Sequence, residues 1–112
     1  MIGMHLLFDA VLSENISQDE VKSLLSSLPT KINMKILFGP LVVLGEPENP
    51  GWTGFVIIDK SHISLHSFEE SHTVSIDVYS CEKFDPEVVV NFLSETLAVT
   101  KVNSCLITRQ IF

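Results

Sequence analysis

The segment SHISLHSFEESHTVSIDVYSC, residues 61 to 81, contains two runs in which apolar and polar residues alternate. Successive side chains of a strand point to opposite faces, so each run predicts a strand with one apolar and one polar face. In the first run, Ile63 and Leu65 lie on the face opposite to His66. The residues Glu69-Glu70-Ser71 between the runs favour a turn, and we expect the two strands to form an antiparallel pair.

The apolar character continues upstream of this segment. We expect one long strand over residues 52–68, followed by a second over 72–81. The sequence EPENPG at 46–51 predicts a loop, because proline fixes φ while asparagine and glycine tolerate turn geometry. Residues 34–45 predict a further strand, which Gly39-Pro40 interrupts or places at the edge of a sheet.

Two helices are predicted by their starting signals. Ser17 with Glu20 three residues later is a capping box, and the helix that it opens covers residues 18–28, where Pro29 ends it. Asp85-Pro86 opens the second helix, with aspartate as N-cap and proline at the first helical position. The apolar residues that recur at helical spacing are Val21, Leu24, Leu25 and Leu28 in the first helix and Val88, Val89, Phe92, Leu93 and Leu97 in the second.

Apolar segments at residues 5–12 and 101–111 predict the first and last strands. The resulting order, β-α-β-β-β-α-β, sets two helices against about five strands. Helices that are separate from a mostly antiparallel sheet form a two-layer α+β sandwich, with both helices on one face. At 112 residues, we expect a single domain over 1–112.

The composition argues against several classes of partner. Fourteen acidic residues against seven basic ones give a formal net charge of -7, which repels phosphate backbones and anionic membranes. We therefore expect no nucleic-acid partner. No apolar run approaches the roughly 20 residues of a membrane span, and the first residues lack the basic region of an export signal. Cys81 and Cys105 are too few for a disulfide scaffold and lack metal-binding spacing, so we expect a reduced, cytoplasmic protein.

The polar faces of the two alternating strands coincide if the strands pair. We then expect His66 and Cys81 to lie on one surface with Ser64, Ser75 and Asp77, where an imidazole base and a thiol acid share a cleft. A merely solvated sheet face is the alternative. His62 and His66 share a strand face but are about 13 Å apart at strand rise, which excludes one metal ion bound by both on a straight strand.

Residues 59–70, DKSHISLHSFEE, resemble the processing-site motif of the short prokaryotic S-adenosylmethionine decarboxylases, which are pyruvoyl enzymes. The resemblance continues through VSIDVYSC at 74–81, where the family has a strand that ends in a catalytic cysteine, and through the helix start at Asp85-Pro86. It also reaches Gly3-Met4-His5-Leu6, which is similar to the family's Gly-x-His-Leu opening. The resemblance therefore spans most of the chain.

The resemblance implies a zymogen that cleaves itself between Lys60 and Ser61. The Ser61 hydroxyl would attack the Lys60 carbonyl in an N→O acyl shift, and β-elimination would leave a pyruvoyl group at residue 61. That group would form a Schiff base with the amine of the substrate and take up the electrons released with CO₂, as pyridoxal phosphate does elsewhere. We therefore expect a covalent pyruvoyl cofactor derived from Ser61, with no pyridoxal phosphate and no metal.

The resemblance also implies roles for other residues. His66 assists the elimination, Cys81 returns a proton to the decarboxylated carbon, and Thr53 stands where the family has a serine that helps processing. Phe68 belongs to the adenine site, and Glu70 matches the acidic residue that binds the ribose. Family members of this length form homodimers of processed protomers with active sites near the interface. The implied function is the supply of aminopropyl groups for spermidine, in polyamine biosynthesis.

Departures from the family pattern leave the substrate open. Lys60 stands where the bacterial enzymes usually have glutamate, and SFEE at 67–70 stands where they have TWPE, so Phe68 replaces a tryptophan. The acidic loop at 46–50 replaces a second adenine-stacking phenylalanine, although Trp52 can supply a ring. Carboxylates in that loop suit a cationic substrate, so a pyruvoyl-dependent arginine or ornithine decarboxylase is one alternative. A homologue that never cleaves itself and serves as a binding or regulatory subunit is the other.

Strand geometry bears on the expected cleavage site. By strict alternation Ser61 shares the apolar face of its strand, opposite to His66, so the chemistry requires a turn or bulge between residues 59 and 62. Activation by putrescine stays open. The histidines to which the sequence assigns no role are His5, His62 and His72.

Overall fold

The computed structural model describes residues 2–110 and 112 of the chain. Within that part, the elements follow the order β1 (Ile2–Leu12), α1 (Gln18–Lys31), β2 (Ile36–Leu44), β3 (Trp52–Ile58), β4 (Ser61–Phe68), β5 (Thr73–Ser80), α2 (Pro86–Thr96) and β6 (Val99–Gln110). The last predicted strand is confirmed as far as residue 110, and residue 111 lies outside the described residues. None of the helices in the described part is long and apolar enough to cross a membrane.

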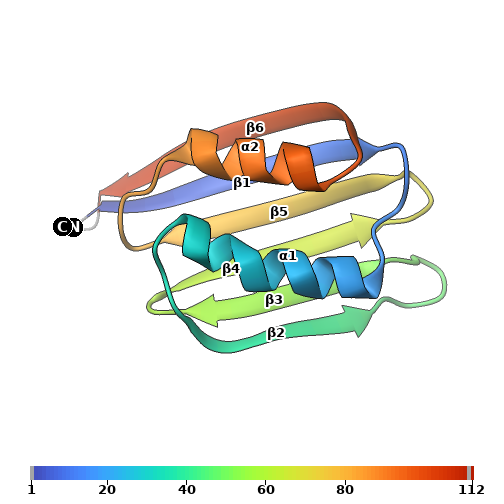
Figure 1. Cartoon of the computed structure of the whole chain (residues 1–112), viewed down its shortest axis with the longest axis horizontal. Coiled ribbons are helices and arrows are strands. Elements are labelled where there is room, and N and C mark those ends of the chain that lie inside the picture. The colour runs from blue at the N-terminus through green and yellow to red at the C-terminus, as the bar shows by residue number, and fades with distance from the viewer. Residues whose placement is uncertain (1, 111) are drawn as a thin grey trace.

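The strands form one sheet in the order β2-β3-β4-β5-β1-β6, and each neighbouring pair is antiparallel. Both helices lie on the same face of this sheet, α1 on the side of β3 and α2 on the side of β6 (Figure 1). The predicted two-layer α+β sandwich is therefore confirmed. We refer to the face that the helices leave bare as the open face.

The prediction of one long strand over 52–68 is wrong. A two-residue turn at Asp59-Lys60 divides this segment into β3 and β4, so the described part has six strands instead of about five, and Ile58 pairs with Ser61 across the turn. The turn carries none of the glycine, asparagine or proline signals of tight turns. Lys60 itself adopts the left-handed conformation, with φ of 51°.

Helix α1 begins as predicted but ends later. The Ser17 side chain accepts a hydrogen bond from the Glu20 backbone N–H, and the Glu20 carboxylate accepts one from Ser17, so the capping box is confirmed. The helix continues past Pro29 to Lys31. Pro29 is buried, and its carbonyl accepts hydrogen bonds from the N–H groups of Ile32 and Met34, so burial and these bonds offset the N–H that proline lacks.

The hydrophobic core fills the space between the helices and the sheet. Fully buried side chains from β1, β3, β4 and β5 meet those of both helices there. At Gly54 of β3, a Cβ atom would lie 2.6 Å from Leu25 Cδ1 and 2.7 Å from Val21 Cγ1, so the missing side chain lets α1 approach the sheet closely. At the far edge, Gly39-Pro40 shifts the register of β2, which confirms the predicted interruption of an edge strand.

The capping box yields a stability prediction. Replacing Ser17 with alanine removes the acceptor for the Glu20 N–H, and we expect the free energy of unfolding to fall by about 1 kcal/mol. Urea unfolding monitored by circular dichroism measures this change. Ser23→Ala, at an exposed position inside the same helix, is the control and should leave the midpoint almost unchanged. Equal effects of the two substitutions would contradict the capping role.

Candidate active site

The polar side chains of β4 and β5 lie together on the open face, as the alternation predicted. His62 pairs with Tyr79, Ser64 with Asp77 and His66 with Ser75. The opposite side chains of both strands, among them Ile63 and Ile76, are fully buried under the helices. The candidate residues divide into two groups at opposite ends of β4.

The first group, the serine–cysteine end, consists of Asp59, Lys60, Ser61 and Cys81. Ser61 is buried on the helix-covered face, and its Oγ accepts a hydrogen bond of 2.9 Å from the Cys81 backbone N–H. The Cys81 thiol donates to the Asp59 carbonyl oxygen at 3.6 Å. Lys60, the residue before the expected scissile bond, is held in a left-handed conformation that costs a non-glycine residue on the order of 1 kcal/mol.

The expected local distortion is a turn and not a bulge. The ladder between β3 and β4 is regular up to the pair Ile58 with Ser61, so the chain reverses only at Asp59-Lys60. Ser61 keeps the face that strict alternation assigns to it. The Ser61 hydroxyl therefore contacts Cys81 because β5 ends beside the turn, and Ser61 does not change face.

The second group, the histidine end, consists of Thr53, His66 and Phe68. Thr53 faces His66 across the β3–β4 ladder, and its Oγ1 lies 3.0 Å from His66 Nδ1. All three residues line a pocket of about 160 Å³, together with Glu46 and Asn49 from the loop before β3. An imidazole, a hydroxyl, an aromatic ring and a carboxylate thus surround one small pocket.

Two further predicted binding residues lie near this end. Trp52 also lines the pocket, and its ring is partly buried against the core. The backbone N–H of Trp52 donates a 2.8 Å hydrogen bond to the Ser67 hydroxyl. Glu70 is exposed in the turn between β4 and β5, outside the residues that line the pocket. The Glu69 N–H donates to the Pro50 carbonyl, which ties that turn to the loop 46–51.

The expectation that His66 and Cys81 share a cleft within one chain is wrong. His66 lies five residues along β4 from Ser61, about 17 Å at strand rise, and on the opposite face. The register pairs His66 with Ser75, six residues before Cys81. Alternation predicts the face of each side chain but not its position along the partner strand, which depends on the turn lengths.

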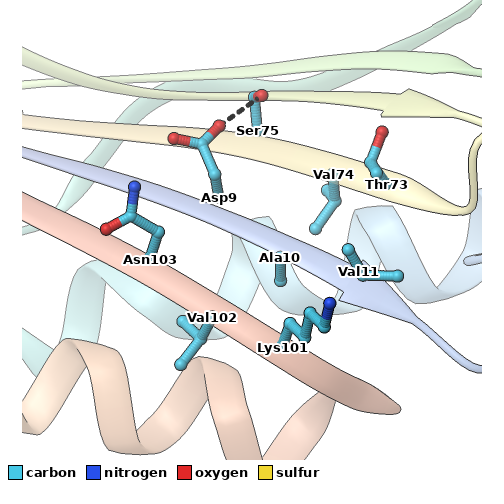
Figure 2. A pocket seen from close by; sticks show the side chains of 9 residues that line it. All are labelled: Asp9, Ala10, Val11, Thr73, Val74, Ser75, Lys101, Val102 and Asn103. Atoms are coloured by element: carbon cyan, nitrogen blue, oxygen red, sulfur yellow. Dashed lines mark hydrogen bonds between the residues drawn. The ribbon is translucent and has the colours of Figure 1, made fainter.

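A polar row crosses the open face at the level of His66. The register aligns Thr53, His66, Ser75, Asp9 and Asn103 on five neighbouring strands. The Ser75 hydroxyl donates a 2.6 Å hydrogen bond to Asp9 Oδ1, and both residues line a groove of about 440 Å³ with Asn103 (Figure 2). The sequence alone did not indicate Asn103 as a site residue, because only the pairing of β6 with β1 brings it into this row.

The histidines without a predicted role lie elsewhere. His62 stacks on Phe55, with ring centroids 5.3 Å apart, and lies 5.7 Å from the Tyr79 ring. His5 Nε2 is 3.6 Å from Asp77 Oδ1. His72 is exposed in the turn before β5. Across residues 2–110 and 112, no three histidine, cysteine or carboxylate side chains gather closely enough to hold a metal ion.

The environment of His62 predicts a pH dependence of stability. Burial of its ring lowers the pKa of His62 below the ordinary 6.5, nearby His5 lowers that pKa further, and Asp77 acts in the opposite direction. The unfolded chain therefore takes up a proton at a pH where the folded ring stays neutral. We expect the free energy of unfolding to fall as the pH drops below 6.5.

Urea unfolding at pH 7.5 and 5.5 measures this dependence. His62→Phe keeps an aromatic ring between Phe55 and Tyr79 but cannot take a proton, so the variant should lose less stability on acidification than the wild type. An unchanged dependence in the variant would contradict the assignment to His62.

The fold and the paired serine and cysteine define the class to which the chain belongs. The structure resembles the crystal structure of the adenosylmethionine decarboxylase from Aquifex aeolicus, with a TM-score of 0.79 and 25% identity over 99% of this chain and 92% of that one. The family model described as S-adenosylmethionine decarboxylase matches residues 5–110. The chain belongs to the S-adenosylmethionine decarboxylase family, as its sequence motifs predicted.

Sequence relatives of the chain are named as S-adenosylmethionine decarboxylase proenzymes. The chain is 34% identical over 98 residues to an S-adenosylmethionine decarboxylase proenzyme of Clostridium botulinum, covering 85% of this chain and 77% of the relative. It is 47% identical over 51 residues to the S-adenosylmethionine decarboxylase proenzyme 2 of Halalkalibacterium halodurans. That second match covers 45% of this chain and only 40% of the relative.

Proposed function

We propose that the protein is a pyruvoyl-dependent carboxy-lyase that removes CO₂ from S-adenosylmethionine, and that the single domain 1–112 cleaves itself between Lys60 and Ser61 to form its catalytic group. The observation that carries this proposal is the 2.9 Å hydrogen bond from the Cys81 N–H to Ser61 Oγ, next to a left-handed Lys60, in a chain of this family. The decarboxylated product is an aminopropyl donor, which suits spermidine biosynthesis.

The cleavage follows from the position of Ser61. Its Oγ attacks the carbonyl carbon of Lys60, an ester bond forms, the amide C–N bond breaks, and the hydroxyl proton passes to the nitrogen of residue 61. Loss of the Cα proton then breaks the Cβ–Oγ bond and frees the Lys60 carboxylate, and one water molecule releases ammonia. The left-handed Lys60 supports this step, because cleavage relieves its conformation.

The residues of the serine–cysteine end fit a group derived from Ser61. A pyruvoyl group there supplies a ketone that takes up electrons when CO₂ leaves. Cys81 carries a thiol proton next to residue 61, with Sγ 3.6 Å from the Asp59 carbonyl oxygen. We assign to Cys81 the return of a proton to the substrate carbon that loses CO₂.

The histidine end must come from a second copy if His66 assists cleavage at Ser61. About 17 Å along β4 separates the two residues within one chain, so the imidazole of a second copy would have to reach the Lys60–Ser61 peptide at the end of the sheet, where the turn at Asp59-Lys60 is exposed. The open face carries exposed large apolar side chains that a second copy can cover, including Leu41, Val43, Phe55, Ile57 and Ile107. We therefore propose a homodimer of processed protomers, in which His66 and Thr53 of the partner subunit complete each site.

The pocket at the histidine end supports a substrate with an aromatic and a polar part. We assign the Phe68 ring to stacking on the adenine, and Trp52 lines the same pocket. Glu70, two residues after Phe68, is assigned to bind the ribose hydroxyls of the substrate. Glu46 also lines this pocket. Its carboxylate supports arginine or ornithine as the second candidate substrate, because a carboxylate in a small pocket attracts a cationic side chain.

A combined mass and activity measurement tests the proposed function. We expect freshly purified wild-type protein to separate, under denaturing conditions, into residues 1–60 and a fragment 61–112 that carries a pyruvoyl end. It should release ¹⁴CO₂ from carboxyl-labelled S-adenosylmethionine. Ser61→Ala should stay one chain and release none, because no hydroxyl is present to form the ester.

The possible outcomes separate the alternatives. Release of ¹⁴CO₂ only from labelled arginine or ornithine would leave the cleavage intact and overturn the proposed substrate. A wild-type chain that stays whole on long incubation would overturn the enzyme proposal in favour of a binding or regulatory homologue. Decarboxylation by Ser61→Ala would overturn the pyruvoyl mechanism itself.

Complementation between two inactive chains tests the shared site. His66→Ala alone should not cleave, since each of its sites lacks the imidazole. When His66→Ala and Ser61→Ala chains are co-expressed with different tags, a mixed dimer contains one site with both groups. We expect the His66→Ala chain to be cleaved in that dimer, as intact mass will record. A purified mixed dimer without cleavage would contradict the contribution of the partner subunit.

A further inference from the structure

We infer that Ser80 is a positioning residue for the self-cleavage: its hydroxyl holds the turn that aims the Cys81 N–H at Ser61 Oγ. The inference rests on the proposed cleavage and concerns a residue outside the groups described above. Ser80 is the last residue of β5 and directly precedes Cys81. Its side chain lies on the face that the helices cover.

The position of Ser80 is one where the strand pattern expects an apolar residue. Val74, Ile76 and Val78 precede it on the same face and are fully buried, and Ser80 is only 1% exposed. A hydroxyl in such a place destabilises the fold unless it is hydrogen-bonded. The bonds of the Ser80 hydroxyl therefore account for its presence there.

Those bonds close a tight turn around Cys81. Ser80 Oγ donates a 2.6 Å hydrogen bond to the Glu82 carbonyl oxygen and accepts one of 3.0 Å from the Glu82 N–H. The hydroxyl also lies 3.5 Å from Met34 Sδ, in the segment that follows α1. Two hydrogen bonds to the backbone of residue 82 fix the peptide groups on both sides of Glu82, the first of which joins Cys81 to Glu82.

The fixed turn determines where Cys81 points. Its N–H reaches Ser61 Oγ at 2.9 Å, and its thiol reaches the Asp59 carbonyl oxygen at 3.6 Å. Because Ser61 Oγ accepts the Cys81 bond, the oxygen is held beside the Lys60 peptide while its own proton stays free to leave. Loss of the Ser80 bonds would free the Cys81–Glu82 peptide, so that Cys81 could shift and its N–H would release Ser61 Oγ.

The test compares two variants of equal size at residue 80. Ser80→Thr keeps the hydroxyl, and Ser80→Val has the same shape without it. Intact mass recorded over time after purification measures the rate of cleavage. We expect Ser80→Thr to cleave within about threefold of the wild-type rate and Ser80→Val to cleave at least tenfold more slowly. Rescue by threonine separates the hydroxyl from mere space filling.

Val89→Ala is the control for stability. Val89 is fully buried on α2, so its truncation lowers the melting temperature without touching the turn. This variant should cleave at the wild-type rate even where it melts lower than Ser80→Val. If Val89→Ala and Ser80→Val both cleave slowly, reduced stability explains the effect, and the inference is overturned.

The outcomes distinguish this inference from the function on which it rests. A wild-type chain that does not cleave overturns the proposed function, whereas equal rates for wild type, Ser80→Thr and Ser80→Val overturn only the role of Ser80. If Ser80→Val does not fold, Ser80→Cys provides the test, because a thiol of similar size forms much weaker hydrogen bonds. Cleavage by Ser80→Cys at the wild-type rate would then overturn the positioning role, and slower cleavage would support it.

Discussion

The antiparallel register of β4 on β5 is the constraint on which the site depends. It places Ile63 opposite Val78 and Leu65 opposite Ile76, so both strands bury their apolar faces together under the helices. The same register brings Cys81 beside Ser61. A slip of one residue would expose these apolar side chains to water and separate the serine from the cysteine. Core packing and the chemistry at Ser61 therefore require the same alignment.

That register also separates the two groups of candidate residues within one chain. A strand as long as β4 keeps its two ends far apart, and the alternation of side chains turns Ser61 and His66 to opposite faces. The helices cover one face of the sheet (Figure 1). The register places His62, His66 and Tyr79 on the other face, together with exposed large apolar side chains. A second copy on the open face would bury this apolar surface, which is why the proposed homodimer has its contact there.

Much of the fold could be predicted from local signals, because capping boxes and alternation act over a few residues. Asp85-Pro86 and the Ser17 capping box placed both helix starts correctly. Local turn signals did not place the turn at Asp59-Lys60, since Lys60 takes a left-handed conformation without a glycine or asparagine at that position. Only the chemistry expected at Ser61 required a turn or bulge there. The distance between His66 and Cys81 escaped for another reason: alternation assigns each side chain to a face, whereas the register set by the turn between β4 and β5 pairs His66 with Ser75. Family resemblance supplied the candidate residues, but neither it nor alternation supplied their arrangement.

The serine–cysteine end exists because the sheet stops there. Within a ladder, a backbone N–H that binds a neighbouring strand has no second proton to offer a side chain. β5 ends at Ser80, so the N–H of Cys81 is free to bind Ser61 Oγ and the thiol can reach the Asp59 carbonyl. A free strand end would be mobile, and the buried Ser80 hydroxyl holds this one through residue 82. The buried serine at the end of an apolar face thus links the end of the sheet to the geometry of the reactive hydroxyl.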